Sequence, residues 1–432
     1  MDDALRRIIV AGLLVCACRL GGAQEMPLLT LQQAHETALR NHPLISVADL
    51  KALAARQVTR EAQSAFYPSL SANVMSVGTA DENTRLAAIG GLNNPLIFDR
   101  NAEGLILSQL ITDFGRTANL SGSAKLRAQA EAASAQATRE QILLAVDNAY
   151  YGALRAQAVT QVAEQTVATR QLFLDQVTAL WTNKMRSELD VSFARVDLAD
   201  GRLLLVKAQN DVQASFAQLS NLLGEREAKT YRLAEQPLPT EVPTNVAVFV
   251  EEALRSRPDL LSLQKARDAA LKFARAEKAL RYPIISAVGS AGVIPVGDSQ
   301  LPDNYAAAGV SVTLPLFTGG MISARRQEAE LRARAAEESL RDLEDNVIRD
   351  VRIAWLNAQN AFDRFRITTQ LLDNARQAFD LAQARYKNQI SSIVEFDQAQ
   401  LSLIAAQIAL ATTQYEYLIE RSALSYQTGS LR

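Results

Sequence analysis

Few side chains in this chain have the types and spacing that catalysis requires. The two histidines, His35 and His42, have no second metal-ligand residue at a spacing typical of a metal site. Asp113-Phe114-Gly115 is the metal-binding tripeptide of protein kinases, but no other kinase motif, nucleophile elbow or phosphate-binding glycine loop accompanies it. The sequence therefore predicts no enzymatic activity, no cofactor and no metal site. We interpret Gly115 as the freely rotating residue of a strand-to-helix turn.

The balance of charge argues against nucleic-acid binding. The chain carries 45 Lys and Arg against 47 Asp and Glu, a net charge of -2, and 21% of its residues are charged. Such a surface offers no strong positive field to the phosphates of nucleic acid. No nucleic-acid partner is expected.

Residues 1–23 have the pattern of a signal peptide. Arg6-Arg7 precede an apolar run that ends near Cys18, and the small residues Gly21-Gly22-Ala23 follow. Export from the cytoplasm is therefore predicted. Both cysteines, Cys16 and Cys18, fall in this segment, so the mature chain would have no disulfide. Lipidation at Cys18, which Ala17 precedes, is the alternative.

The mature chain is a tandem repeat. Tyr67-Pro68 recurs as Tyr282-Pro283, an offset of 215 residues, and Gly224 recurs as Gly429, an offset of 205. The offset decreases from 215 to 205 within a polar loop, and surface loops tolerate insertions. The predicted domains are a first repeat over residues 24–224, a proline-containing linker over 225–245 and a second repeat over 246–432.

After each Tyr-Pro pair, the hydrophobic period changes to two. Val310, Val312 and Leu314 alternate with the polar Ser311 and Thr313. This alternation is typical of a strand with one apolar and one polar face. Across both repeats it predicts four strands, at about 69–77, 103–113, 284–293 and 305–314.

Each repeat then contains one long helix, from Gly115 to about Trp181 and from Gly320 to about Tyr386. Apolar residues recur there in steps of four and three, as in a coiled-coil seam, and Arg170 is the one charged residue in the first seam. At about 1.5 Å per residue, each helix would be on the order of 100 Å long. Return helices are expected at residues 189–223 and 394–427, so each repeat ends in a helical hairpin with a tip.

The predicted fold is mainly α with a small transmembrane β part. Four strands cannot close a barrel, and an open sheet edge in lipid would leave backbone groups unpaired. If the strands are transmembrane, the chain must oligomerise, and two, three or four copies would give eight, twelve or sixteen strands. The alternative is a soluble periplasmic coiled-coil scaffold in which the four strands form a small capping sheet.

This order of elements, found twice, closely resembles the outer-membrane efflux protein family, the TolC-like exporters. The match runs through helix, Tyr-Pro, hairpin, a strand ending in Asp113-Phe114-Gly115-Arg116 or before Gly319-Gly320, long helix, tip and return helix. The resemblance implies a homotrimer, with a twelve-stranded barrel among outer-membrane lipids and a twelve-helix periplasmic tunnel. It also implies a passive exit duct for efflux or type I secretion, energised by an inner-membrane pump through a periplasmic adaptor. The sequence does not distinguish a drug, a metal or a protein as the substrate.

The resemblance further implies a pore gate at the tips. The segment Ile393–Phe396 matches the family's tip, where an acidic residue faces the pore, so Glu395 is the candidate for a cation-favouring ring of three carboxylates. An ordinary solvated glutamate is the alternative. Asp190 holds the equivalent position in the first repeat, and a hydrogen bond from Tyr386 to Asp190 is the expected tie that keeps the aperture shut. Tyr386 could equally be a plain seam aromatic.

The tip residues expected to face the adaptor are Asn183, Lys184, Ser187, Asn388, Gln389 and Ser392. The family commonly has glycine where Lys184 and Gln389 stand, and a basic residue near Ser391 is absent here. The resemblance also assigns strand-to-helix turns to Asp113, Gly115, Gly319 and Gly320.

Overall fold

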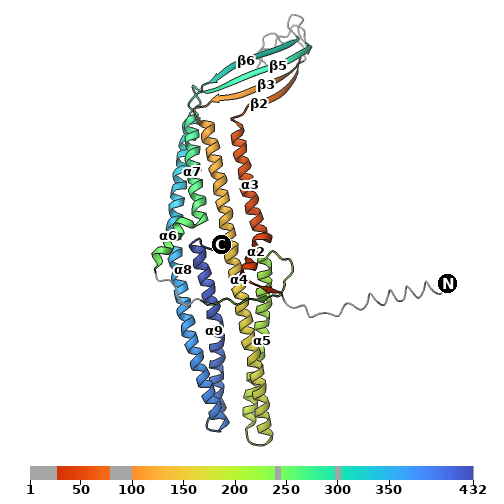
Figure 1. The fold of residues 1–432 in the computed structure, drawn as a ribbon, viewed down its shortest axis with the longest axis vertical. Coiled ribbons are helices and arrows are strands. Elements are labelled where there is room, and N and C mark those ends of the chain that lie inside the picture. Colours follow the sequence, from red (N-terminus) through yellow and green to blue (C-terminus); the bar gives the residue numbers. More distant parts are fainter. Residues whose placement is uncertain (1–26, 78–99, 239–244, 297–302, 432) are drawn as a thin grey trace, which may run out of the picture. The chain divides into compact units, whose positions relative to one another are not determined.

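The computed structural model describes residues 27–77, 100–238, 245–296 and 303–431, and it is mainly helical, as predicted (Figure 1). The predicted signal peptide lies outside these residues. In chain order the elements are β1 (Leu28–Leu29), α2 (Leu31–Asn41), α3 (Pro43–Ser64), β2 (Ser69–Val77), β3 (Arg100–Thr112), α4 (Arg116–Thr182), α5 (Glu188–Leu222), β4 (Arg232–Leu233), α6 (Val246–Ser256), α7 (Pro258–Ala279), β5 (Ile284–Val296), β6 (Asn304–Thr313), α8 (Met321–Lys387) and α9 (Ile393–Gln427).

The helices come in pairs of equal length. α2 and α6 have 11 residues each, α3 and α7 have 22, α4 and α8 have 67, and α5 and α9 have 35. Pro43 and Pro258 begin α3 and α7, because proline lacks the N–H that the first helical turn leaves unbonded anyway. The strands, by contrast, differ in length between the two halves.

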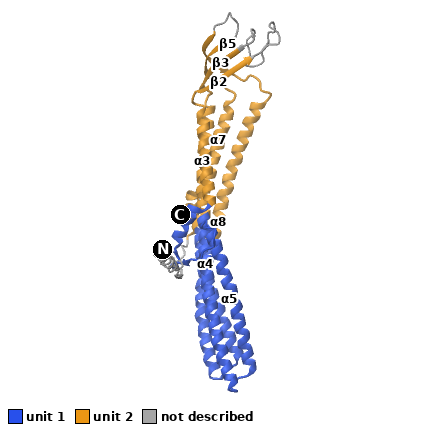
Figure 2. Ribbon diagram, turned by 90° about the vertical axis from the view of Figure 1, so that its right-hand side faces the viewer, with its two compact units in different colours: residues 1–42, 142–243, 356–424 blue, residues 43–141, 244–355, 425–432 orange. Residues whose placement is uncertain are grey.

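The chain divides into two compact units, coloured in Figure 2. The first, which we call the hairpin unit, contains residues 1–42, 142–243 and 356–424. The second, which we call the sheet unit, contains residues 43–141, 244–355 and 425–432.

The sheet unit carries a four-stranded antiparallel sheet in the order β2-β3-β5-β6. The inner strands β3 and β5 pair with each other, which joins the two repeats into one sheet. The outer strands β2 and β6 each pair on one side only. Both edges of the sheet therefore present unpaired backbone groups in a single chain.

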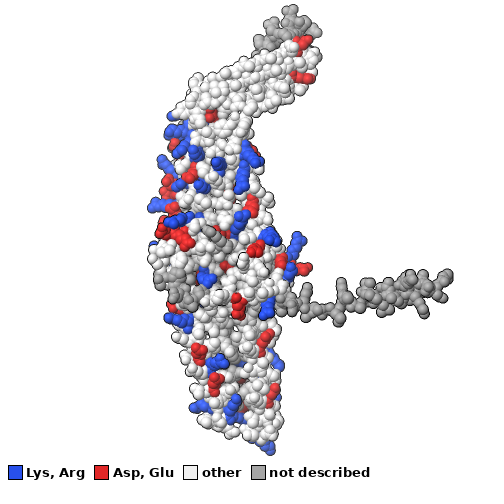
Figure 3. Space-filling view, viewed as in Figure 1, with Lys and Arg blue, Asp and Glu red and all other residues white. Residues whose placement is uncertain are grey.

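The two faces of this sheet differ in chemistry. The strand register places Leu70, Leu107, Gly289 and Ala308 side by side on one face, and Leu105, Val310 and Val312 share that face. The other face is mixed: hydroxyl and amide side chains at Ser69, Ser71, Asn73, Ser108, Ser286, Ser290, Ser311 and Thr313 share it with apolar side chains at Met75, Ile106, Leu110, Ile284 and Val288. Figure 3 shows the strands nearly free of charge on the side in view, and large exposed apolar residues on the first face include Leu70, Val74, Val310 and Val312.

Glycines let a tyrosine lie flat across three strands. Tyr305 of β6 is paired with Gly292 of β5, which is paired with Gly104 of β3. A Cβ added at Gly104 would lie 2.2 Å from the Tyr305 hydroxyl, and one at Gly292 would lie 2.2 Å from the Glu103 carbonyl oxygen. Neither position can carry a side chain without moving its neighbours.

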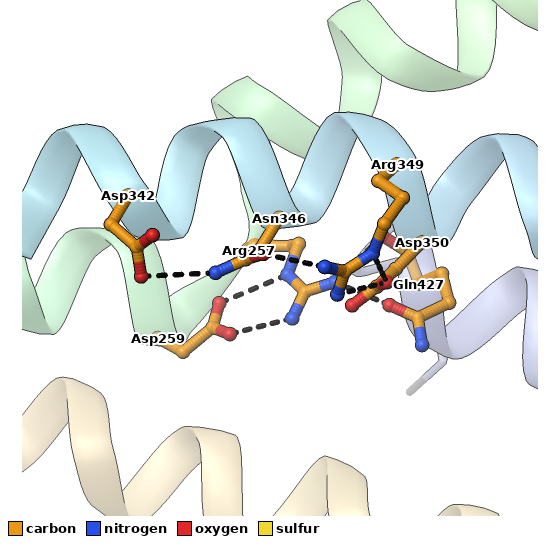
Figure 4. A network of polar contacts seen from close by, with 7 residues as sticks. All are labelled: Arg257, Asp259, Asp342, Asn346, Arg349, Asp350 and Gln427. Atoms are coloured by element: carbon orange, nitrogen blue, oxygen red, sulfur yellow. Dashed lines mark hydrogen bonds and ion pairs between the residues drawn. The ribbon is translucent and has the colours of Figure 1, made fainter.

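Helix contacts complete the sheet unit. Arg139 of α4 binds both carboxylate oxygens of Asp49 on α3, at 2.7 and 2.9 Å. A polar network at the start of α7 ties in the C-terminus, as Figure 4 shows. There the Arg257 guanidinium binds the Asp259 carboxylate at 2.6 Å and donates to the side-chain oxygen of Gln427 at 2.5 Å. The end of α9 is therefore held by a partly buried arginine and not by apolar packing alone.

The hairpin unit contains two helical hairpins, residues 142–182 of α4 with α5 and residues 356–387 of α8 with residues 393–424 of α9 (Figure 1). The predicted seams are buried along much of their length: Val146, Ala153, Ala163 and Val177 in α4 and Ala358, Ala361, Ala382 and Tyr386 in α8 are each 5% exposed or less. Trp181, which the seam pattern also included, is 41% exposed.

The sequence did not predict β1 and β4, which form a parallel pair inside the hairpin unit. The buried Tyr150 of α4 donates its hydroxyl to the carbonyl oxygens of Leu29 and Ala234, which fixes this pair to the helix. Part of the predicted linker is therefore ordered structure. Among the residues that the structure describes, no helix combines the length and the apolar character that spanning a membrane requires.

Candidate functional site

Both hairpin tips turn in the same way. Lys184 and Gln389 have φ angles of 60° and 61°, in the left-handed region. After α4, the Lys184 N–H donates to Trp181 and the Met185 N–H donates to Leu180; after α8, Gln389 and Ile390 repeat the pattern to Tyr386 and Arg385. This is the Schellman C-cap, which usually has glycine at the left-handed position. The return helices α5 and α9 have glycine there, at Gly224 and Gly429, so among these four helix ends the two tips are the ones with a side chain at the strained left-handed position.

Hydroxyl side chains start the return helices. Ser187 caps α5 by accepting from the Asp190 N–H at 3.2 Å, and the Asp190 carboxylate accepts from the Ser187 N–H at 3.2 Å. This is a reciprocal capping box. Ser392 accepts from the Glu395 N–H at 3.4 Å at the start of α9. Two of the residues expected to face an adaptor therefore also define where the helices begin.

An aromatic cluster joins the two hairpins behind the tips. Phe173 of α4 contacts Phe396 of α9 with ring centroids 4.6 Å apart, and Phe396 stacks on Tyr386 of α8 at 5.4 Å. Phe379 also contacts the Phe396 ring. Tyr386 and Phe396 are 4% and 2% exposed, and a cavity of about 190 Å³ lies beside them. Apolar burial thus holds the hairpins together in one chain.

Arg186 adds a polar clamp that sequence reasoning missed. Its guanidinium donates to the Tyr386 carbonyl oxygen at 2.9 Å and lies over the Tyr386 ring, 4.1 Å from the centroid. One arginine in the first tip therefore holds the last turn of α8 through both a charge-assisted hydrogen bond and a cation–π contact. The only sequence signal was a basic residue directly before the capping serine.

The expected hydrogen bond between Asp190 and Tyr386 is not formed within the chain. The buried Tyr386 hydroxyl has no hydrogen-bond partner, and the Asp190 carboxylate is taken up by the capping box of α5. Burial raises the pKa of Tyr386, Arg186 opposes that shift, and the Asp190 charge adds to it. Asp190 therefore lies near Tyr386 and influences it electrostatically, while Arg186 makes the direct contact.

Glu395 lies on the exposed side of α9 and has a partner in its own tip. Its carboxylate forms an ion pair with Arg385 at 3.0 Å, and both side chains are about half exposed. An exposed pair of this kind contributes little to stability. Its main effect is to hold the Glu395 carboxylate beside a positive charge.

The six residues expected to face an adaptor are all exposed: Asn183, Lys184, Ser187, Asn388, Gln389 and Ser392. Asn183 and Asn388 occupy equivalent places, and each donates its side-chain amide to the carbonyl four residues earlier, at 2.8 and 2.9 Å. These bonds cap the last turns of α4 and α8. The tip surface is therefore polar and built on a fixed backbone.

The two strand-to-helix turns of the sheet unit also have similar backbone conformations. Phe114 and Gly115 have φ angles of 56° and 90°, and Gly319 and Gly320 have 60° and 85°. The buried Asp113 carboxylate accepts from the N–H groups of Gly115 and Thr117, at 3.2 and 2.6 Å, and so caps α4. Asp113 thus has a capping role. Among the residues that the structure describes, no group of three or more metal-ligating side chains is assembled.

These features define a class: a chain with two long helical hairpins and a sheet that is incomplete by itself. The sequence model for the outer membrane efflux protein matches residues 34–225 and 249–430. The chain therefore belongs to the outer membrane efflux protein family. It is an outer-membrane channel that serves as an exit duct in efflux or secretion, and the family is one of transport channels, not enzymes.

Individual relatives are distant but cover most of the chain. The outer membrane protein TolC of Escherichia coli K12 is 23% identical over 419 residues, which is 93% of this chain and 82% of TolC. The alkaline protease secretion protein AprF of Pseudomonas aeruginosa is 24% identical over 418 residues, 93% of this chain and 85% of AprF. The crystal structure of VceC from Vibrio cholerae has a TM-score of 0.78 at 22% identity, covering 92% of this chain and 96% of VceC.

Proposed function

We propose that three copies of this chain form a passive outer-membrane exit duct that is gated at its helical tips. Each copy would contribute four strands to a twelve-stranded barrel and four long helices to a periplasmic tunnel. The observation that carries this proposal is the sheet: four strands with one largely apolar face, one face of mixed polarity and two unpaired edges.

Physical chemistry supports closure of the sheet by further copies. The apolar face suits lipid, and the mixed face, with its hydroxyl side chains, is the one that suits a water-filled lumen, while unpaired edges cannot remain open in hydrocarbon. Edge β2 of one copy would pair with edge β6 of the next, and such head-to-tail pairing closes into a ring. The choice of three copies rests on the family, because the sheet alone does not fix the number.

The hairpin unit offers matching surfaces for neighbouring copies. α5 exposes a row of apolar residues at heptad-like spacing, and α8 exposes another; the rows comprise Leu189, Phe193, Val196, Leu203 and Val206 on α5 and Leu356, Ile367, Leu371 and Leu381 on α8. Their own chain does not cover these residues. Packing α5 of one copy against α8 of the next would bury both rows as a coiled-coil seam.

The gate would lie at the tips. Arg186, Tyr386 and the aromatic cluster hold the two hairpins of one chain together, and Asp190 positions the first turn of α5 beside them. Glu395 remains the candidate for a ring of three carboxylates, with Arg385 partly compensating its charge. Opening would separate the hairpins and widen the ring.

The proposed partners are a periplasmic adaptor and an inner-membrane pump. AprF is named for alkaline protease secretion and OprJ is named an outer membrane protein. The exposed tip residues, with Lys184 and Gln389 at the turns, are the proposed adaptor-facing surface.

Heating the purified protein in detergent tests the assembly. The expected result is a trimer band on a gel that converts to a monomer only after boiling. The scaffold alternative predicts a protein that stays soluble without detergent and runs as a monomer before boiling. That outcome, together with an absence of conductance in planar bilayers, would refute the proposed function.

A further inference from the structure

The two repeats pair their strands in the same register. In the first repeat Ser69 of β2 is opposite Ser108 of β3, and in the second Ile284 of β5 is opposite Thr313 of β6. The two pairs are related by the repeat offsets, which are 215 residues from β2 to β5 and 205 residues from β3 to β6. The sheet therefore consists of two equivalent hairpins, and each residue of one hairpin can be matched to a residue of the other.

The junction between β3 and β5 shows how one hairpin joins the next. Leu107 of β3 is opposite Gly289 of β5, and a Cβ added at Gly289 would lie 3.9 Å from Cβ of Leu107. Pairing with β2 ends at Ser108, but β3 continues to Thr112 because β5 pairs with it there. The last residues of β3 are thus part of a strand only through the following hairpin.

The corresponding end of β6 has no such neighbour. Residues 314–317 match residues 109–112 at the offset of 205, yet β6 ends before them. Leu314, Leu316 and Phe317 are 49%, 89% and 91% exposed. Among the residues that the structure describes, no strand pairs with this segment. It has the place of a strand end without the neighbouring strand that β5 provides to β3.

We propose that β2 of one copy and β6 of the next pair in the register that joins β5 to β3 within the chain. The inference rests on the proposed function, because it requires further copies to close the sheet. A closed barrel needs a consistent stagger between neighbouring strands, so the junction between copies should repeat the junction between repeats. Applying the two offsets to Gly289 and Leu107 places Val74 of one copy opposite Val312 of the next.

The same register accounts for the exposed segment after β6. The pair two residues further along the junction converts to Ala72 opposite Leu314, and the last pair converts to Leu70 opposite Phe317. Between them the register shift of the β3–β5 junction falls directly after Pro315, and proline is tolerated at such a bulge because the ladder is already interrupted there. Each copy would therefore extend β6 of its neighbour and cover side chains that a single chain exposes.

The faces of the sheet agree with this register. Val74 and Val312, which are 74% and 62% exposed, both lie on the largely apolar face, so two apolar side chains would be cross-strand neighbours. Asn73 and Thr313, which the register also places opposite each other, both lie on the mixed face. A slip of one residue would set the apolar face of one copy against the mixed face of the next. A slip of two residues preserves the faces, so the register needs a direct test.

Cysteine pairs in the purified full-length protein provide that test. In Val74→Cys with Val312→Cys, the two Cβ atoms should lie near the 3.9 Å of the junction within the chain, and disulfides form at Cβ separations of about 3.5–4.5 Å. Within one chain β2 and β6 are about 14 Å apart, because two strands lie between them, so the bridge can form only between copies. After oxidation, this variant should shift from a monomer to covalent oligomers on a boiled, non-reducing gel. A reductant should restore the monomer.

Matched variants separate this register from others. Val74→Cys with Val310→Cys is shifted by two residues, so the Cα atoms would be about 7–8 Å apart and should not form a bridge. Ala72→Cys with Leu314→Cys should form a bridge only if β6 extends past the end that it has in a single chain. Each single variant should remain a monomer on the boiled gel. The single variants also control for the two native cysteines, which lie in the predicted signal peptide.

The outcomes are distinct. A bridge in Val74→Cys with Val310→Cys and none with Val312→Cys, or a bridge in either single variant, would overturn the register. An oligomer that dissociates only on boiling, with no bridge in any pair between copies, would overturn the register while the channel assembly stands. Leu107→Cys with Gly289→Cys should form its bridge within one chain, which shows that oxidation is effective. If no oligomer exists before boiling and no pair between copies forms a bridge, the proposed function and the register both fail.

Discussion

Replacing Arg186 should loosen the tip. The side chain is the one direct polar link between the first tip and the last turn of α8 that the structure describes, and it acts through a hydrogen bond of 2.9 Å to the Tyr386 carbonyl and a cation–π contact at 4.1 Å. Arg186→Gln removes the charge and the planar stack but keeps a polar side chain. We expect a larger fraction of open channels, because the closed tips lose a contact that separated hairpins do not make.

The size of the effect can be estimated from the two contacts. A hydrogen bond to a charged group contributes about 1.5–3 kcal/mol and a partly exposed cation–π contact about 0.5–1 kcal/mol. Arg186 is only half-buried, so we take a total of about 2 kcal/mol per chain. That corresponds to a change of about 30-fold in the equilibrium between closed and open tips, because 1.36 kcal/mol is a factor of ten.

Single-channel recording in planar bilayers measures this change directly. Arg186→Gln should raise the mean conductance, and Arg186→Lys should give an intermediate value, because lysine keeps the charge without the planar fork. Arg202→Gln is the matched control, since Arg202 donates a hydrogen bond to Gln171 of the same hairpin at 3.2 Å. Tyr386→Phe should change little, because the hydroxyl has no partner. Equal conductance of wild type and Arg186→Gln in a folded trimer would refute the clamp.

Three further outcomes are expected. Glu395→Gln should lessen cation selectivity and block by multivalent cations, and an unchanged reversal potential would rule against a carboxylate ring. Gly292→Ala should weaken β3–β5 pairing by about 1–3 kcal/mol and lower the temperature at which the oligomer dissociates on gels, because its Cβ would lie 2.2 Å from a backbone oxygen; Gly309→Ala, with nothing within 4 Å, is the neutral control. Lys184→Gly and Gln389→Gly should each stabilise their tip turn by about 0.5–1 kcal/mol, through relief of the left-handed strain, and reduced thermal stability of both would contradict this reasoning.

The sequence by itself determined the features that depend on neighbours along the chain. Hydrophobic residues that share one face recur every second residue in a strand and about every three and a half residues in a coiled-coil helix. The sequence therefore predicts the strands and the coiled-coil seams directly. Tyr67-Pro68 and Tyr282-Pro283 marked the entries to the strands because proline ends a helix locally. Membership of the efflux class followed from the order of these elements, and the comparison with known families confirmed it.

Only the tertiary structure decided which distant residues meet. Arg186 and Tyr386 are 200 residues apart in sequence, and Phe173 and Phe396, whose rings are in contact, belong to different repeats. No local sequence pattern predicts such pairs, because contact between these side chains depends on how the four helices pack against each other. Local sequence patterns likewise do not predict that Tyr305 lies over Gly292 and Gly104, or that β1 pairs with β4. The resemblance predicted a gate at the tips, and packing decided that Arg186, not Asp190, makes the direct contact with Tyr386.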